Sequence, residues 1–478
     1  MAGSKNPLYV DIMALHPEVT GSCIFCVVKD AILKKTLKFV VDCGLFQEVE
    51  HNKLNDKDFP FKPENLDFAL ITHNHLDHIG RFPLLVRKGF NKNIYTTKGT
   101  SMFLKRAWNN TVEILEQKAK INNQNPLYDK DDVTETLSKI RDCEFAEPIQ
   151  VAENVVVTFY MNGHVPGASI IHVKISSDFS EDDINLIFTG DYKKDNIFFD
   201  VEPLPKELLN LPVSIVCEST YGDMNSSEIN YTFKDNIDKA IKKGKKHIVI
   251  PAFSFARTQE LLYSLKLMQE AKIIPKSYQI YLDGKLSQSY TNLFVNQAET
   301  LGFKDEMYDF LPKDLKNIYK EERYAIMKDP NPKIIVTSAG MGSYGPAQMH
   351  IPEVITKHNG LVHFTGYMAE GTLGRDLQEA KEGDMVKIGG IIKKKLADVL
   401  YTNEFSSHAK EDEIIEFLND FSSKKLILFN HGEKETKEQL AKDAFESVKA
   451  KDIGILGNDI LFRVGPYGLI KTMSTKFC

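Results

Sequence analysis

The segment LITHNHLDHIG, residues 70–80, places three histidines and an aspartate within six residues. Imidazole nitrogens and carboxylate oxygens are the ligands that zinc and similar divalent ions take in proteins. An apolar run that reads as a strand precedes the segment. A tight loop after a strand end can turn His73 and His75 toward one ion while Asp77 and His78 reach a second. A lone histidine is more often a packing residue, but this spacing is difficult to explain by packing, so the segment predicts a metal site.

Other histidines and aspartates stand at the ends of further apolar runs. One loop cannot complete the ligand shells of two ions, so the remaining ligands must come from elsewhere in the chain. Four residues that end apolar runs in the same manner are Asp42, His164, Asp191 and His431. Each alone is a weak signal. Their repetition predicts that several strand ends meet at one polar site.

The elements that must position these residues follow two different patterns along the sequence. The first two hundred residues read as short strands with alternating apolar positions, interrupted by a charged, helix-favouring segment at 101–141. From about Lys246, strands such as 247–253 and 278–284 alternate with helices, which predicts parallel βαβ units. After about Leu396, strands and helices continue to the end. We therefore expect one β-rich domain that is interrupted by an α/β domain and completed by the C-terminal part.

The motif H-x-H-x-D-H with downstream His, Asp and His resembles the signature of the metallo-β-lactamase superfamily. The resemblance implies an αββα sandwich with two metal ions. The ligand sets that it implies are His73, His75 and His164 for one ion, Asp77, His78 and His431 for the other, and Asp191 as the bridge. Asp42 matches the family's strand-end aspartate, which orients a ligand histidine, and we count Asp42 and Asp77 among the catalytic residues. Two ions about 3.5–4 Å apart would neutralise the oxygens of an in-line displacement at phosphorus.

The insertion that interrupts the first domain indicates which branch of the superfamily the chain resembles. Glu218 stands in VSIVCESTYGD, His408 in EFSSHA and His431 in NHGE. This pattern is similar to the β-CASP nucleases, whose motifs A, B and C are an acid, a histidine and a histidine. A histidine in motif C is typical of the RNA-processing branch, which includes the pre-mRNA 3′-end cleavage endonuclease and ribonuclease J, whereas a valine is typical of the DNA branch. The resemblance implies a ribonuclease in which Glu218 holds His408 so that its imidazolium protonates the leaving 3′ oxygen.

Three alternatives to a ribonuclease stay open at this point. A DNA nuclease or another phosphodiesterase of the same fold would use the same metal ligands. A non-catalytic RNA-binding scaffold is the third, although such relatives have lost ligands and all seven ligand positions are filled here. For Glu218 and His408 alone, a surface salt bridge is the simpler role.

The resemblance covers nearly the whole chain and therefore sets domain boundaries. We expect the first part of the metallo-β-lactamase domain at 1–222, a β-CASP domain with a mainly parallel sheet at 223–394, and the returning part of the first domain at 395–478. The expected fold class is α/β throughout.

Candidate substrate contacts lie inside the expected insert. Ser338, Ala339 and Gly340 follow an apolar strand, where small residues let backbone N–H groups approach a phosphate. Arg257 and Arg375 open helices after strand ends and could bind an anionic ligand. An ordinary strand-to-helix turn and interdomain salt bridges are the alternatives. The histidines to which we assign no functional role are His16, His51, His172, His247, His350, His358 and His363.

Composition sets limits on these interpretations. With 42% hydrophobic and 26% charged residues among 478, the chain is globular rather than disordered or coiled-coil. A net charge of −6 argues mildly against a nucleic-acid binder, because phosphate contacts usually require a basic excess. Several of those acids belong to the predicted site, however, and bound metal would reverse the local potential there.

The expected cofactors and partners follow from the same considerations. We expect two divalent ions, zinc or else manganese, because His/Asp ligand shells accept both. The expected partner is RNA, preferably single-stranded, and a homodimer is left open. Six cysteines are too few for a secreted disulfide scaffold, and there is neither a signal peptide nor an apolar run of about 20 residues. A cytoplasmic location without membrane contact is therefore expected.

Overall fold

The computed structural model describes residues 8–16, 18–47, 51–343, 345–366, 368 and 371–474. The chain divides into two compact units. The first, here called the split unit, comprises the residues up to Ser226 together with those from His408 onward, and the second, the inserted unit, runs from Ser227 to Ser407.

The split unit contains an eight-stranded sheet in the order β23-β22-β1-β2-β3-β4-β5-β6. Its strands are β1 (Leu8–Ala14), β2 (Ile24–Asp30), β3 (Lys35–Val41), β4 (Phe68–Leu70), β5 (Ile94–Thr97), β6 (Ile140–Cys143), β22 (Ile460–Gly465) and β23 (Gly468–Ser474). The pairs from β3 to β6 are parallel, so the carboxyl ends of β3 and β4 lie at the same edge. Asp42 and the predicted metal motif follow those two strand ends.

The second sheet of the split unit has the order β21-β20-β11-β10-β9-β8-β7. Its strands are β7 (Ile149–Ala152), β8 (Val155–Met161), β9 (Ser169–Ile175), β10 (Ile184–Phe188), β11 (Pro212–Glu218), β20 (Ser423–Asn430) and β21 (Ile453–Ile455). β20 pairs in parallel with β11 and β11 in parallel with β10. The strand before the insertion and a strand after it are therefore neighbours, which brings Glu218 and His431 to one sheet edge.

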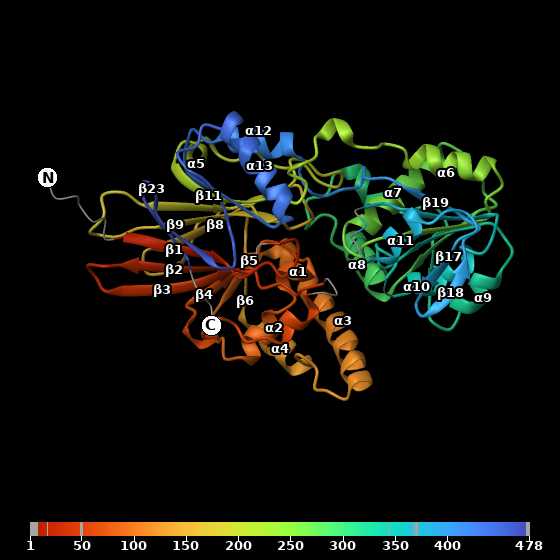
Figure 1. Ribbon diagram of the computed structural model, residues 1–478, viewed down its shortest axis with the longest axis horizontal. Helices are drawn as coiled ribbons and strands as arrows, with labels where there is room; N and C mark the ends of the chain where they lie inside the picture. Colours follow the sequence, from red (N-terminus) through yellow and green to blue (C-terminus); the bar gives the residue numbers. More distant parts are fainter. Residues whose placement is uncertain are drawn as a thin grey trace. The chain divides into compact units, whose positions relative to one another are not determined.

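Helices cover the outer faces of both sheets. They are α1 (Leu76–Ile79), α2 (Phe82–Arg87), α3 (Lys98–Asn122), α4 (Lys130–Lys139), α5 (Lys206–Leu209), α12 (Glu411–Asp420) and α13 (Lys434–Ser447). Figure 1 shows α1 to α4 on the side of the first sheet and α5, α12 and α13 on the side of the second. Apolar side chains from both sheets, such as Ile12, Phe39, Val173 and Leu428, fill the space between them. The αββα sandwich implied by the sequence is confirmed.

The inserted unit is built on a six-stranded sheet in the order β14-β13-β15-β12-β16-β19, in which every pair is parallel. Its strands are β12 (His247–Pro251), β13 (Gln279–Asp283), β14 (Lys316–Ile318), β15 (Lys333–Thr337), β16 (Gly360–Phe364) and β19 (Asp398–Tyr401), beside an antiparallel hairpin of β17 (Met385–Ile388) and β18 (Ile391–Lys394). The predicted mainly parallel sheet is confirmed. β19 lies beyond the boundary expected at residue 394, yet it belongs to this unit because it pairs with β16.

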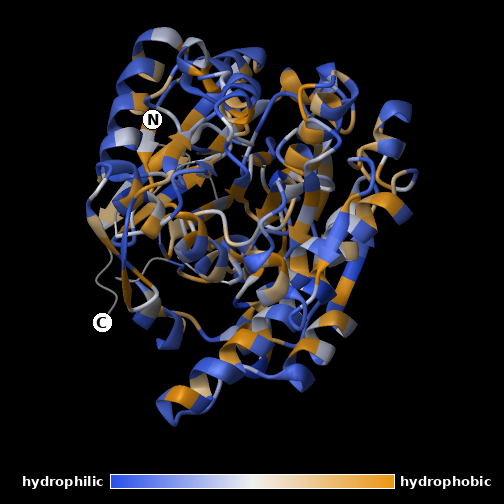
Figure 2. Cartoon of the chain, turned by 90° about the vertical axis from the view of Figure 1, so that its right-hand side faces the viewer, coloured by the Kyte–Doolittle hydropathy of each residue, from blue (hydrophilic) through white to orange (hydrophobic). Residues whose placement is uncertain are grey.

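The helices of the inserted unit are α6 (Phe233–Lys242), α7 (Arg257–Glu270), α8 (Lys285–Asn296), α9 (Arg323–Lys328), α10 (Ala347–Val354) and α11 (Leu373–Glu379). Side chains of α6 and α7 form one apolar cluster with the sheet, and those of α10 and α11 form another. The central strands are buried along their whole length and are accordingly continuous apolar runs. In Figure 2 the hydrophobic residues concentrate on strands and on inward helical faces.

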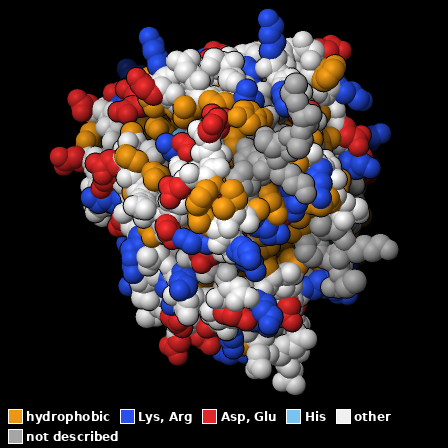
Figure 3. Space-filling model, turned by 90° about the vertical axis from the view of Figure 1, so that its left-hand side faces the viewer, with side chains coloured by type: hydrophobic (Ala, Val, Ile, Leu, Met, Phe, Trp, Pro, Cys, Tyr) orange, Lys and Arg blue, Asp and Glu red, His pale blue; other side chains and the backbone are white. Residues whose placement is uncertain are grey.

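Charged side chains of both signs are mixed on the surface. On the face drawn in Figure 3, Lys and Arg side chains lie among Asp and Glu side chains, so both signs of charge are present there. Within the described residues, no helix is long and apolar enough to cross a membrane.

Candidate metal centre

The H-x-H-x-D-H motif begins in the loop after β4 and ends in α1, which carries Asp77 and His78, and backbone contacts hold this segment in place. The carbonyl oxygen of Asp77 accepts a hydrogen bond from the Ser22 N–H at 2.8 Å, and that of His78 accepts one from the Cys43 N–H at 2.7 Å. Gly44 permits this close approach, because a Cβ at that position would lie 1.5 Å from the Asp77 carbonyl oxygen. The loop is therefore fixed by the ends of β2 and β3 rather than by its own short helix.

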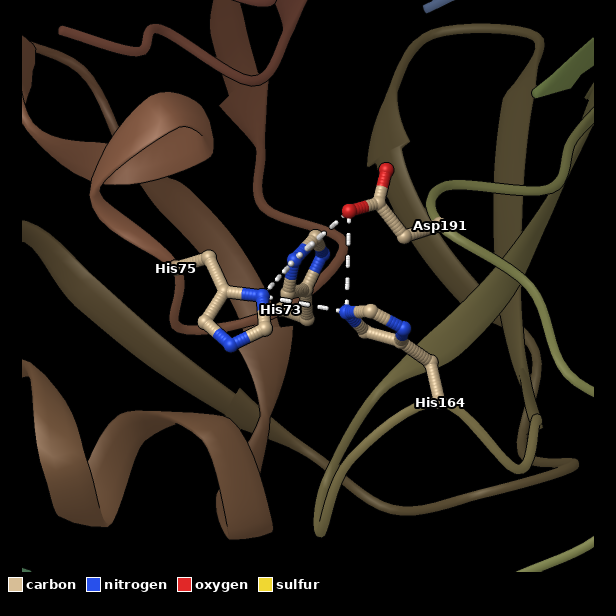
Figure 4. Close-up of side chains that lie close together, drawn as sticks. All are labelled: His73, His75, His164 and Asp191. Carbon is tan, nitrogen blue, oxygen red and sulfur yellow. Dashed lines mark hydrogen bonds and ion pairs between the residues drawn. The ribbon is translucent and has the colours of Figure 1, made fainter. Parts of the chain in front are cut away.

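Figure 4 shows the first of two groups of ligand-type side chains, formed by His73, His75, His164 and Asp191. His75 Nδ1 lies 3.0 Å from both His73 Nε2 and His164 Nε2. Asp191 Oδ2 lies 3.5 Å from the same two Nε2 atoms. His164 follows β8 and Asp191 follows β10, so three strand ends from both sheets converge here.

The second group shares Asp191 and adds Asp77, His78 and His431. His78 Nε2 lies 3.2 Å from His431 Nε2 and 3.1 Å from Asp191 Oδ1. Asp77 Oδ2 lies 3.6 Å from His431 Nε2. Each carboxylate oxygen of Asp191 therefore faces a different group, as a residue that bridges two ions would.

The chemistry of these donor atoms fits divalent ions. Two ligands of a tetrahedral zinc with bonds of about 2.1 Å are about 3.4 Å apart, and the donor atoms of His73, His78 and Asp191 have neighbours at 3.0–3.5 Å. Burial lowers the pKa of His73 well below its usual value and that of His75 to about 4, so both imidazoles are neutral and offer a lone pair. Burial also acts on His78, but the carboxylates of Asp191 and Asp42 outweigh it and hold its pKa well above the usual value. The carboxylates thus stabilise positive charge at this point.

Asp42 orients His78 from outside the donor group. Its Oδ2 accepts a hydrogen bond from His78 Nδ1 at 2.7 Å, which leaves Nε2 to face the centre. Its two oxygens also accept the Thr72 N–H and Oγ1–H, both at 2.8 Å. Asp42 adopts a left-handed backbone conformation, with φ of 62°, at the end of β3. The same residue therefore has a strained backbone conformation and orients an imidazole that faces the candidate metal centre.

Two further polar side chains hold the remaining histidines. His431 Nδ1 lies 3.1 Å from Thr220 Oγ1 and 3.3 Å from Asp191 Oδ1, while its Nε2 lies near His78 and Asp77. Asn162 accepts the backbone N–H of His164 at 2.8 Å and donates to the Asp191 carbonyl oxygen at 3.0 Å.

Sequence reasoning did not identify these supporting side chains. The residues missed are Thr72, Asn162 and Thr220. Each lies within two positions of a residue that the sequence did single out, and that proximity is the only signal that the sequence contains.

Glu218 and His408 form a pair beside the two groups. Glu218 Oε2 lies 2.9 Å from His408 Nδ1, and the other carboxylate oxygen accepts the Tyr192 N–H. His408 Nε2 lies 3.9 Å from Asp191 Oδ2. Burial lowers the pKa of His408, but the carboxylates of Glu218 and Asp191 outweigh burial and raise it above the usual value. The structure therefore places a readily protonated imidazole at the edge of the centre, with Glu218 2% exposed and the His408 side chain 20% exposed.

The five predicted substrate contacts lie in the inserted unit, after the carboxyl ends of parallel strands. The Ser338 N–H donates to the Asp283 carbonyl oxygen at 3.2 Å, and the Gly340 backbone packs against the ring of Phe253. The loop 338–340 is thus tied to β13 and to the end of β12. The Ser338 N–H is therefore already hydrogen-bonded within the unit, and the substrate contacts of Ser338, Ala339 and Gly340 stay predictions.

The two predicted arginines already have partners inside the unit. Arg257 is buried, donates to the Thr365 carbonyl oxygen and lies 3.7 Å from the Glu260 carboxylate. Arg375 is more exposed and makes an ion pair of 2.6 Å with Glu379 on the same helix. Their phosphate roles stay predictions, and binding a phosphate would require each guanidinium to share or exchange a partner.

Three family models match consecutive parts of the chain. Residues 31–203 match the metallo-beta-lactamase superfamily, residues 258–377 match the Beta-Casp domain, and residues 394–453 match the Zn-dependent metallo-hydrolase RNA specificity domain. The first and third matches lie largely in the split unit and the second in the inserted unit.

Curated relatives align over most of the chain. Ribonuclease TTHA0252 of Thermus thermophilus is 27% identical over 87% of this chain and 91% of its own length. RNase J-like protein of Methanocaldococcus jannaschii is 26% identical over 86% of this chain and 91% of its own. Transcription termination factor FttA of Methanosarcina mazei is 26% identical over 86% of this chain, which spans only 66% of that relative's length.

Proposed function

The chain carries metallo-β-lactamase, β-CASP and RNA-specificity domains in one polypeptide, and from this domain set we propose that it is a metal-dependent ribonuclease of RNA processing or decay. The finer proposal is a dinuclear zinc centre that hydrolyses phosphodiester bonds of single-stranded RNA. Two relatives that align over nearly their whole length carry ribonuclease names, which supports RNA as the substrate.

The observation that carries this proposal is the position of Asp191 between two groups of imidazoles. One carboxylate oxygen faces His73 and His164, and the other faces His78 and His431. With Asp77 and His75, these residues would hold two divalent ions. Such a pair supplies Lewis-acid stabilisation to the attacking and leaving oxygens of a displacement at phosphorus.

The chain's own residues supply the proton. Hydrogen bonding to Glu218 fixes the Nδ1–H of His408, so that Nε2 carries the exchangeable proton toward the centre. The pKa of His408 is raised by Glu218 and Asp191 against the effect of burial, which keeps the imidazolium populated near neutral pH. A histidine in that state is suited to donate a proton to the departing 3′ oxygen as the phosphodiester bond breaks.

The experiment that tests the function is product mapping with the zinc-loaded protein. End-labelled single-stranded RNAs with 5′-triphosphate, 5′-monophosphate and hairpin-blocked ends are incubated alongside DNA strands of the same sequence. Cleavage of RNA in preference to DNA supports the proposal, and the product lengths then distinguish trimming from an end from internal cutting. Preferential cleavage of DNA would instead identify a DNA nuclease, and RNA binding without cleavage under zinc or manganese would identify a scaffold.

A further inference from the structure

A third group of ligand-type side chains lies in the split unit, apart from the two that share Asp191. It consists of His16, Glu18 and His51, whose donor atoms all lie within 4.8 Å of one another. Glu18 Oε2 lies 3.6 Å from His51 Nε2 and 4.0 Å from His16 Nε2. These are two imidazoles and one carboxylate directed at a common point, from two segments that the chain separates by more than 30 residues.

No hydrogen bond to a described residue explains the orientation of His16 Nε2. The residue is 6% exposed, and its Nε2 atom is buried without a hydrogen-bond partner among the residues that the structure describes. Buried polar atoms are nearly always paired, because an unpaired one has lost its hydrogen bonds to water without gaining others. The ring is held edge-on against Phe46 and His51, with centroid separations of 4.8 and 4.9 Å, so packing fixes where Nε2 points. A partner is therefore missing at that point.

We propose that His16, Glu18 and His51 form a third divalent-ion site, separate from the dinuclear centre, that takes zinc or manganese. Three protein ligands leave an open coordination position for water or an anion, as in exchangeable zinc sites. Glu18 and His51 are 48% and 32% exposed, so the open position faces solvent. This inference goes beyond the proposed function and does not depend on it.

The third site is weaker than the dinuclear centre for two reasons. Its ligand separations of 3.6 and 4.0 Å exceed the roughly 3.4 Å that tetrahedral zinc requires, so the ion must draw its ligands together. The more exposed Glu18 has room for that movement. Arg81 and Lys437 also place positive charge near His16, which opposes binding of a cation. The third site is therefore expected to bind its ion weakly and to exchange it with free metal in solution.

The test is metal stoichiometry, which needs no substrate. Metal-free protein is dialysed against increasing free zinc, and bound zinc is counted by mass spectrometry. The wild-type chain is expected to bind three equivalents, of which the weakest is lost in His51→Ala and in Glu18→Gln. Both substituted side chains are partly exposed, so the fold is expected to survive, and circular dichroism checks that it does.

A matched control excludes loss of an ordinary surface ion pair. His358 Nδ1 lies 3.6 Å from Glu382 Oε1 with both side chains exposed, and no third ligand-type side chain joins them in the described part of the chain. His358→Ala is therefore expected to keep all three equivalents. Cobalt substitution gives a second readout, since the wild-type spectrum minus that of His51→Ala should contain bands of a protein-ligated ion. The proposal is overturned if the Glu18→Gln and His51→Ala variants bind as many equivalents as the wild-type chain, whatever the occupancy of the dinuclear centre.

Discussion

His408 Nδ1 lies 2.9 Å from Glu218 Oε2, although 190 positions separate the two residues in sequence. Glu218 ends the strand that precedes the inserted unit, and His408 follows the last residue of that unit. This contact therefore joins the two segments that flank the insertion, and it also orients the imidazole that we propose as the proton donor. This arrangement leads to two predictions about catalysis.

His408→Ala is expected to slow RNA cleavage by about 100-fold or more, the usual contribution of a positioned acid. The variant should retain both ions of the dinuclear centre, because His408 is not among the donor atoms of either group. Turnover is measured on single-stranded RNA and bound metal is counted in the same preparation. His358→Ala, on an exposed side chain, is the control. Wild-type turnover in His408→Ala would contradict the assignment.

Glu218→Gln is expected to change the pH dependence of kcat rather than only its size. Glu218 raises the pKa of His408 against the effect of burial, so its loss lowers that pKa. If His408 is the general acid that we propose, its protonated form is the active one, and that form is then lost at lower pH. The alkaline limb of the kcat profile should therefore move to lower pH, with activity recovering toward acid. A uniform decrease at every pH would indicate a structural role instead.

Asp42→Asn tests the residue that orients His78. The amide can adopt the left-handed conformation at φ of 62°, so the fold should be retained. It cannot accept all three hydrogen bonds that the carboxylate accepts, from the Thr72 N–H, the Thr72 Oγ1–H and His78 Nδ1, because one of its two terminal atoms is an NH2 donor. Metal affinity is expected to fall by about 10- to 100-fold, as for other residues that orient a ligand. Competition with a chromophoric chelator measures it, and Asp67→Asn, on an exposed side chain, should leave affinity unchanged.

Gly44→Ala tests whether close backbone packing positions the metal loop. The added Cβ would lie 1.5 Å from the Asp77 carbonyl oxygen, which the loop can relieve only by moving. The variant should lose the ion held by Asp77 and His78 although no ligand has changed. Gly457→Ala is the matched control in the same unit, because its Cβ would meet no atom closer than 3.2 Å. Equal metal content in both variants would refute this role of Gly44.

Metal removal should destabilise the split unit. Trp108, the one tryptophan of the chain, is fully buried there and donates from Nε1 to the Ile79 carbonyl oxygen at 2.9 Å, one residue after His78. An ion present at 100 times its Kd stabilises the folded state by about 2.7 kcal/mol. A chelator should therefore lower the Tm observed by tryptophan fluorescence, and added zinc should restore it. An unchanged Tm would mean that the loop is held without the ions.

Much of the fold could be predicted from residue patterns. The alternation of apolar runs and helices from Lys246 onward predicted a parallel sheet, because buried parallel strands are continuous apolar runs. The domain boundary near residue 394 was harder to predict from the sequence, because β19 is short and its pairing with β16 is a long-range contact. Local pattern carries no information about which of two sheets a short strand joins.

The sequence by itself determined which residue types stand at the strand ends, including the motif that begins at His73. It did so because the ends of apolar runs and the spacing of ligands are local properties. Only the tertiary structure decided that the two oxygens of Asp191 face different groups of imidazoles. It also decided that His16 and His51, to which the sequence assigned no role, meet at Glu18. Such meetings depend on how separate loops pack against one another, and packing across long chain separations is not encoded in any single segment.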